Sequence, residues 1–543
     1  FCSRVVGFVL LLYCSGARAA PCAILLRHNF AILIVLECWI QLVQGFTLNF
    51  AVPRISGQVP YFFGRTSKPI ASPISDTRRQ HLDNPLMSIF PSGSGCTGAF
   101  QKSRGEIRVE LPYALDNSDP FVFDTMTARV PTKIIGRTVK YNKNILPAEI
   151  LDKLAAIGAE MRANAVITKL RQGPDVDHWN ECLVPYLQKS ATWNQLPWFV
   201  GETYVYHRLL EASGFWDPTS PGYDVDIFGP EKRESLELSL VQVQTRMAMC
   251  KEAEGRWTLP YFTALVHMSL WGNQGDSSLF TVADIATMGT GGGAGLLCDA
   301  TEDMWNLVST TQAAQVHVLT DNAGMELVSD LALAHYLLSS GPAAVASVTL
   351  HLKPHPFFVS DATRRDVEHT LATLAAAADP NQQAVARDLR GHVTAGRLIL
   401  SGSGPVSLLA ASPEPFWRMS PQARAALAPA TLAVLKGDLM YRKLLGDCQF
   451  DSAESFDDVA AYFPCAVAAL RTCKSPVAVG LRPGQARALS ESAPGWLVEG
   501  AFGMVQLARP PPVTRVDSDP ARRTLLVSFD PDQALRDCAP LFR

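Results

Sequence analysis

Two oxygen-bearing side chains end a short apolar run in the middle of this 543-residue sequence. Asp321 and Asn322 follow the run 316–320, and apolar residues then repeat at helical spacing from Glu326. This pattern predicts a strand, a tight turn and a helix. Ligands bind at the carboxyl ends of parallel strands, and carboxylate and amide oxygens suit Mg²⁺ or Mn²⁺ better than Zn²⁺. Taken alone, the pair is more typical of a helix cap and turn than of a metal site.

A further carboxylate occurs one strand–helix–strand unit later. Asp361 follows the apolar run 348–352 and leads into a second helical pattern. Neighbouring strands of a parallel sheet would bring Asp321 and Asp361 to the same edge. Helix capping is the alternative role for Asp361.

A basic segment follows a third apolar run, at 432–435. Gly437 permits a sharp turn, and Asp438 with the basic side chains around it suits a phosphate near a metal. Arg442 could hold a phosphate by a two-pronged contact, which lysine cannot make. A solvated run of charges is the alternative.

Three other segments are weaker signals. The tetrapeptide 471–474 says little in isolation, and the polar residues of 270–279 suit either a pocket lining or a turn. The segment 289–294 matches G-x-G-x-x-A, the fingerprint of dinucleotide or adenosyl cofactors. It lacks a convincing preceding strand and a polar segment follows it, so a flexible loop is favoured. No P-loop, G-x-S-x-G or H-E-x-x-H motif occurs.

The composition is that of a globular protein with enough apolar residues for two or three domains. Hydrophobic residues make up 48% and charged residues 18%, and the net charge is −3. The absence of a basic excess argues against nucleic-acid binding. The 12 cysteines are scattered without a C-x-x-C pair, which favours reduced thiols and a cytoplasmic location.

The amino-terminal region has a different character from the rest of the chain. It combines apolar stretches with an Ala-x-Ala site near residue 20, so a signal or anchor competes with a dispensable extension, which we favour. Membrane contact is expected only through this region. Order is expected from about Leu111. We expect an apolar extension at 1–50, a disordered linker at 51–107, a helical subdomain at 108–290, an α/β catalytic domain at 291–515 and a loose tail at 516–543.

Short apolar runs and helical patterns alternate in the second half of the chain. This alternation predicts a parallel sheet covered by helices, preceded by helices from 147 to about 270. The expected strands lie at 315–320, 346–352, 397–401, 431–436 and 503–508.

Several of these segments, taken in order, resemble a known family over roughly residues 108–515. They are similar to the metal-dependent damage-control phosphatases, in particular the sugar-phosphate phosphatase subfamily, whose R-T-x-K motif matches Arg471 to Lys474. The segments are 192–198 (TWNQLPW), 202–208 (ETYVYHR), 270–273 (LWGN), 321–326 (DNAGME), 356–361 (PFFVSD), 436–443 (KGDLMYRK) and 471–474 (RTCK).

The resemblance implies a Rossmann-like α/β/α sandwich with a mostly parallel sheet, packed against a helical N-terminal subdomain. It implies a divalent metal, Mn²⁺ or alternatively Co²⁺, Ni²⁺ or Mg²⁺, and hydrolysis of fructose 1-phosphate, fructose 6-phosphate and related esters. Met440 stands where the family more usually has Asn, and His207 interrupts the Tyr206–Arg208 motif. The implied metal ligands and catalytic residues are Asp321, Asn322 and Asp361, and the implied substrate contacts are Asp438, Leu439, Met440, Tyr441, Arg442 and Lys474.

Members of this family are also described as S-adenosylmethionine-dependent protein carboxyl (glutamate) O-methyltransferases. Glu326 and Asp361 match the assigned adenosyl-cofactor positions. From the residues and the resemblance together, we expect a phosphatase acting on a small sugar phosphate, by direct attack of water rather than through a phospho-enzyme. The methyltransferase is the alternative, and a catalytically silent binding scaffold is a third. The physiological substrate and oligomeric state stay open.

Overall fold

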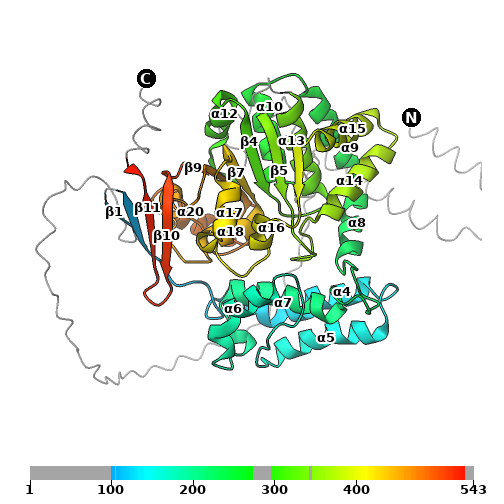
Figure 1. Ribbon diagram of the computed structural model, residues 1–543, viewed down its shortest axis with the longest axis vertical. Helices are drawn as coiled ribbons and strands as arrows, with labels where there is room; N and C mark the ends of the chain where they lie inside the picture. Colours follow the sequence, from blue (N-terminus) through cyan, green and yellow to red (C-terminus); the bar gives the residue numbers. More distant parts are fainter. Residues whose placement is uncertain (1–99, 104, 273–294, 341–344, 532–543) are drawn as a thin grey trace, which may run out of the picture. The chain divides into compact units, whose positions relative to one another are not determined.

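The computed structural model describes residues 100–103, 105–272, 295–340 and 345–531 (Figure 1). All of them belong to one compact unit, Ser92–Arg543. The apolar extension 1–50, the polar residues 273–279 and the glycine-rich segment 289–294 lie outside the described residues. Within the described ranges, no helix combines the length and apolarity needed to cross a membrane.

The centre of the fold is a seven-stranded sheet with the order β3-β9-β8-β7-β4-β5-β6. Neighbouring strands are parallel except for the antiparallel pair β8–β9, so the expected mostly parallel α/β sheet is confirmed. The strands are β3 (Leu296–Asp299), β4 (Ala314–Leu319), β5 (Val345–His351), β6 (Leu398–Ser401), β7 (Leu432–Lys436), β8 (Val467–Thr472) and β9 (Gly503–Ala508).

The sheet is buried because helices pack on both of its faces (Figure 1). Every residue of β7 and β8 is buried, as expected for continuous apolar runs in a parallel sheet. Val434 packs in a core shared with the first group of helices, α9 (Leu240–Glu252), α10 (Leu259–Leu270), α12 (Thr301–Thr310), α13 (Met325–Ser339), α14 (Arg364–Ala376) and α15 (Pro380–Thr394). Leu435 points into a second core shared with α16 (Pro405–Ala410), α17 (Pro421–Leu427), α18 (Gly437–Leu445) and α19 (Phe456–Val459).

A helical layer formed by the N-terminal third of the described chain packs on this second core. It contains α3 (Pro120–Asp124), a π-helical stretch (Thr125–Ile134), α4 (Ile135–Tyr141), α5 (Ala148–Arg162), α6 (Val176–Leu187) and α7 (Trp198–Ser213). Within the helical region expected from 147 to about 270, the segment 229–252 forms two helices, α8 (Gly229–Leu238) and α9. Helices α9 and α10 pack on α13, although they precede residue 291, where the α/β domain was expected to begin.

A second, four-stranded antiparallel sheet joins the two ends of the described chain. Its order is β1 (Phe100–Ser103), β2 (Glu106–Glu110), β11 (Thr524–Phe529) and β10 (Val513–Asp519). The segments 100–103 and 106–107, expected in a linker, and 516–519 and 524–529, expected in a loose tail, are therefore strands. The alternation of apolar and polar residues that would indicate a strand is short here, because β2 has only Ile107 and Val109 as buried residues between polar neighbours. Its other half, β11, lies some 400 residues further along the chain.

Candidate functional site

Four adjacent strands end in polar residues at the same edge of the large sheet. β4 leads to Asp321 and Asn322, β5 leads to Lys353, β7 ends in Lys436, and β8 leads to Lys474. These strands are mutually parallel neighbours, so their carboxyl ends coincide. This is the edge at which open α/β sheets bind ligands.

The structure brings Asp321, Asn322 and Asp361 together, as the sequence predicted. Asn322 and Asp361 form a backbone bridge, and the Ala362 N–H donates to the Asp321 carbonyl at 2.7 Å. The Asn322 amide donates from Nδ2 to Asp321 Oδ2 and to Glu326 Oε2, both at 2.8 Å. The three predicted ligand side chains therefore occupy one buried cluster.

The loop that carries Asp361 is conformationally strained. Phe358 and Val359 both have left-handed backbones, with φ of 45° and 67°. This region is unfavourable for side chains with a Cβ, and most of all for a β-branched residue such as Val359. Packing holds the loop, since Phe358 stacks on Tyr206 at 4.6 Å between ring centroids. The next residue, Ser360, donates through its hydroxyl to Asn322 Oδ1.

Two buried lysines, which the sequence analysis did not single out as site residues, neutralise part of this cluster. Lys353 Nζ lies 3.0 Å from Asp361 Oδ2 and donates to the Thr320 carbonyl at 2.7 Å. Lys436 Nζ lies 3.2 Å from both Glu326 Oε1 and Asp330 Oδ1. Their positions in the sequence could have indicated this role, since each lysine lies at the carboxyl end of an apolar strand, as the predicted ligands do.

The electrostatics of the cluster favour a cation. Burial, followed by repulsion from Glu326 and Asp361, raises the pKa of Asp321 well above its usual value, while Lys353 and Lys474 act in the opposite direction. Burial also raises the pKa of Asp361, against the attraction of Lys353. The two carboxylates lie close together without enough positive charge to balance them. With the nearby amide oxygen of Asn322, they form the kind of oxygen donor set that binds a hard divalent ion. The residues present therefore fit the metal that the sequence implied.

Gly437 fixes the position of Asp321 from the opposite side. Its φ is +74°, and a Cβ added there would lie 1.8 Å from Asp321 Oδ2. The start of α18 can therefore approach the Asp321 carboxylate closely only because residue 437 has no side chain. The first backbone N–H groups of this helix have no partners within the helix.

The R-T-x-K segment forms a turn held by its buried arginine. Arg471 Nε donates to Asp438 Oδ1 at 2.7 Å, and its other nitrogens donate to the carbonyls of Val477 and Ser475. Asp438 Oδ1 also accepts from the Lys474 N–H at 3.2 Å. Asp438, expected to contact substrate, therefore anchors the turn that presents Lys474. The charge of the half-buried Lys474 side chain acts to lower the pKa of Asp321.

Arg442 does not have the environment expected of a phosphate ligand. Its Nε and Nη2 donate to the two oxygens of Asp447 at 2.8 and 2.7 Å, and Nη1 donates to Glu202 Oε2 at 2.6 Å. The guanidinium also lies 3.4 Å from the ring centroid of Trp198. The two-pronged contact expected with phosphate is thus made with Asp447. In this structure Arg442 ties α18 to α7.

The side chains of Leu439, Met440 and Tyr441 are buried in the core beneath α18. The Tyr441 hydroxyl accepts from the Val479 N–H at 3.1 Å, and its ring lies under Arg471. These residues were expected to bind substrate, but their side chains have other partners. Any contact from Leu439 or Met440 would have to come from their backbone.

The sequence of this chain is similar to known proteins over most of its length. Residues 125–489 match the model of the damage-control phosphatase ARMT1-like domain. The damage-control phosphatase ARMT1 of Rattus norvegicus is 29% identical over 452 residues, covering 74% of this chain and 99% of that protein. The human protein of the same name is 27% identical over 452 residues, with the same coverage.

A solved structure was also found, a DUF89 family protein from Pyrococcus horikoshii. It has 16% sequence identity and a TM-score of 0.34, and the match covers 65% of this chain and 96% of that one. The family match spans well over half of the chain. The chain therefore belongs to the damage-control phosphatase ARMT1-like family, and it is a phosphatase.

Proposed function

We propose that this phosphatase hydrolyses sugar phosphates such as fructose 1-phosphate and fructose 6-phosphate, using a divalent cation held by Asp321, Asn322 and Asp361. The observation that carries the proposal is the convergence of these three side chains with Lys474 at the carboxyl edge of the sheet. Such an edge, with oxygen donors beside a cation, suits a phosphate monoester better than an uncharged ligand.

The charges of the site support a dianionic substrate. Asp321, Glu326, Asp330 and Asp361 face three lysines, of which two are buried in ion pairs. The cluster alone is therefore short of positive charge. A divalent cation would reverse this balance and supply a Lewis acid for the phosphoryl oxygens. Of these three lysines, Lys474 is the one for which no carboxylate ion pair is seen among the described residues, which supports a role for its ammonium group in binding the phosphate.

The other residues position the site rather than react. Ser360 and Glu326 fix the Asn322 side chain from its two ends. Lys353 orients Asp361, and Arg471 holds the turn before Lys474. The N-terminus of α18 lies beside Asp321, and because its first N–H groups have no partner within the helix, it favours an anion there. Such pre-positioned charge is the main contribution a protein makes to phosphoryl transfer.

The methyltransferase alternative is not favoured by the comparisons, which name phosphatases. One of its proposed cofactor contacts, Glu326, is already bound by Asn322 and Lys436. The glycine-rich segment 289–294 lies outside the described residues.

Phosphate release by the purified full chain tests the proposal. With fructose 1-phosphate or fructose 6-phosphate, activity should vanish after exhaustive chelation and return with Mn²⁺, Co²⁺, Ni²⁺ or Mg²⁺. Asp361→Asn should lose nearly all activity while keeping its fold by circular dichroism, whereas Asp152→Asn, on the exposed face of α5, should behave as wild type. Full turnover after chelation, or methyl transfer from labelled S-adenosylmethionine without phosphate release, would overturn the proposal.

A further inference from the structure

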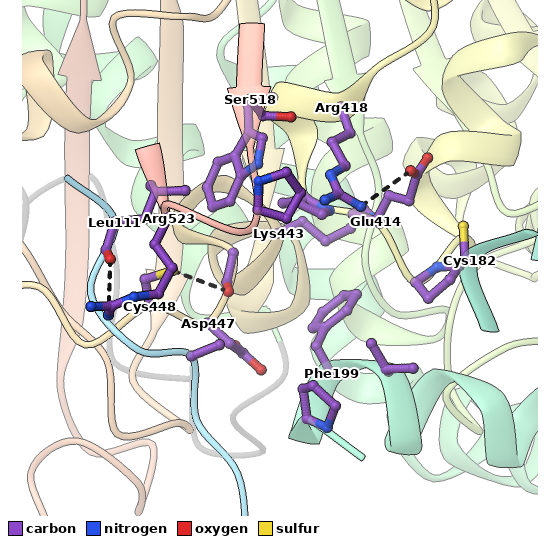
Figure 2. Close-up of a pocket in the computed structure, with 18 of the residues that line it drawn as sticks. Leu111, Cys182, Phe199, Glu414, Arg418, Lys443, Asp447, Cys448, Ser518 and Arg523 are labelled. Carbon is purple, nitrogen blue, oxygen red and sulfur yellow. Dashed lines mark hydrogen bonds and ion pairs between the residues drawn. The ribbon is translucent and has the colours of Figure 1, made fainter. Parts of the chain in front are cut away.

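A cavity of about 330 Å³ lies where three parts of the fold meet (Figure 2). Its walls come from α6 and α7 of the helical layer, from the loop 413–418 and the end of α18, and from the turn 518–523 between β10 and β11. None of Asp321, Asn322, Asp361 and Lys474 lines it. The proposed phosphatase chemistry therefore leaves this cavity unexplained.

Three side chains able to bind a metal gather at this cavity. His178 and Cys182 stand one turn apart on the same face of α6, and Glu414 faces them from the loop. His178 Nε2 lies 2.9 Å from Glu414 Oε2 and 4.0 Å from Cys182 Sγ. The three donor atoms lie within 4.8 Å of one another. Cys182 and Glu414 line the cavity itself, on the same side of it in Figure 2.

The loop that carries Glu414 is held by a buried cation. Lys443 Nζ donates to the carbonyls of Ser412 and Glu414 at 2.7 and 2.6 Å. Phe199 and Phe416 lie against the same ammonium group, 5.0 and 5.7 Å from it at their ring centroids. The backbone of Glu414 is thus fixed in front of α6, and its carboxylate faces His178 through Oε2 and Arg418 through Oε1.

The donor set differs in kind from that of the oxygen-rich cluster at the sheet edge. One imidazole nitrogen, one thiol sulfur and one carboxylate oxygen are typical ligands of Zn²⁺. In tetrahedral zinc with bonds of about 2.0–2.3 Å, neighbouring donors stand roughly 3.3–3.6 Å apart. The two separations from His178 Nε2, 2.9 and 4.0 Å, bracket this range, and the Cys182 and Glu414 donor atoms lie within 4.8 Å of each other.

A second group of possible ligands, Glu254, His335 and Asp388, is different. Lys251 lies between its two carboxylates, in contact with Glu254 and 3.4 Å from Asp388. The lysine already supplies the positive charge that an ion would bring. Around His178, by contrast, Arg418 approaches Glu414 only at the 4.0 Å limit of an ion pair.

We propose that His178 Nε2, Cys182 Sγ and a Glu414 oxygen bind a zinc-like transition-metal ion that ties α6 to the loop 413–418. Three protein donors leave the fourth tetrahedral position to water or to a ligand in the cavity. On binding, the Cys182 thiol forms a sulfur–metal bond and its proton passes to solvent. Without the ion, burial and then the charge of Glu414 raise the pKa of Cys182 to about 12, so the thiol is protonated.

Titration of the metal-free full chain with Co²⁺ tests this site. A cysteine ligand gives a thiolate-to-cobalt charge-transfer band in the near ultraviolet, which an all-oxygen site cannot give. We expect the band in wild type and in Asp361→Asn, which removes only a proposed ligand of the sheet edge. It should disappear in Cys182→Ser and need at least about tenfold more Co²⁺ in Glu414→Gln, because even outer-shell changes weaken metal sites by about 10- to 100-fold.

Cys298→Ser is the matched control. Cys298 is half-buried like Cys182, and burial raises its pKa to about 12 as well, but it lies on β3. This variant should keep the band. No band in wild type, or a band that survives Cys182→Ser, would overturn the site. If Cys182→Ser does not fold, His178→Ala decides, since His178 is half-exposed. Zn²⁺ should raise the melting temperature of wild type but not of His178→Ala, and equal shifts would also refute the proposal.

Discussion

Replacement of Gly437 by alanine tests the placement of Asp321 without removing any proposed ligand. The added Cβ would lie 1.8 Å from Asp321 Oδ2 and 2.3 Å from its Cγ. An ordinary contact requires at least 3.4 Å, so the Asp321 carboxylate or the start of α18 must move by more than 1 Å. Gly437→Ala should therefore disturb the proposed cation site while every donor atom remains.

Two effects of different size follow from this substitution. The left-handed backbone at φ +74° costs about 1–2 kcal/mol for a residue with a Cβ, which lowers stability only. Displacement of a site group by about 1 Å can lower the rate of the chemical step by about 100-fold. We expect kcat/KM for fructose 1-phosphate to fall by about 100-fold or more, with a much higher Mn²⁺ requirement.

Gly484→Ala separates the two effects. Gly484 has φ +81°, and a Cβ added there would meet no atom within 4 Å. The Gly484→Ala variant should lose the same unfolding free energy, about 1–2 kcal/mol, for its left-handed backbone, measured in urea, while its kcat/KM stays at the wild-type value. If Gly437→Ala stays within about threefold of Gly484→Ala in kcat/KM, Asp321 is not a catalytic ligand in the position described.

Three other variants test separate parts of the structure. Lys474→Ala should lower kcat/KM about 10- to 150-fold without changing metal affinity, since a charge-assisted hydrogen bond contributes about 1.5–3 kcal/mol. Lys443→Met should remove a pH dependence of stability. Burial lowers the pKa of Lys443 to about 7 in the folded protein, so above that pH the unfolded chain binds more protons than the folded one. The unfolding free energy of wild type should therefore rise by roughly 2 kcal/mol between about pH 7 and 9, and that of the variant should not. Removal of residues 1–110 should lower the unfolding free energy by at least about 3 kcal/mol, because Ile107 and Val109 are buried.

Each of these variants has a control and a contradicting result. Lys153→Ala, at an exposed position on α5, is the control for Lys474→Ala, and equal kinetics in the two would remove Lys474 from the site. Parallel stability curves of wild type and Lys443→Met from pH 7 to 9 would refute the low pKa. Removal of residues 1–91, which lie outside the described residues, should leave stability unchanged. If the longer deletion behaves identically, β2 does not stabilise the fold.

The large sheet and the convergence of Asp321, Asn322 and Asp361 were predictable because their signals are local. Each expected strand began and ended within one residue of the observed one, since a buried parallel strand appears as an unbroken apolar run. Polar residues directly after such runs must then meet at one edge. A strand at 467–472 escaped notice because Arg471 and Thr472 belong to it.

The partners of the charged side chains were not predictable from spacing. Arg442 and Arg471 both lie next to apolar runs. Arg442 was expected to bind phosphate, and the segment that begins with Arg471 indicated no role in isolation. Arg442 is bound to Glu202, which lies 240 positions away, and Arg471 on β8 is bound to Asp438 at the start of α18. The small sheet was missed for the same reason, because β2 pairs with β11 from the far end of the chain. Contacts between distant segments leave no periodic signal.

The left-handed backbone at Val359 has a consequence for attempts to make this enzyme more robust. Glycine at position 359 would relieve a conformation that costs a β-branched residue about 1–3 kcal/mol, although it would also remove the buried Val359 side chain. Because these two effects oppose each other, the melting temperature should change little, while the turn that presents Ser360 and Asp361 loosens and turnover falls. Libraries screened for melting temperature alone would therefore retain poorly active protein at this position, and phosphate release has to be selected alongside it.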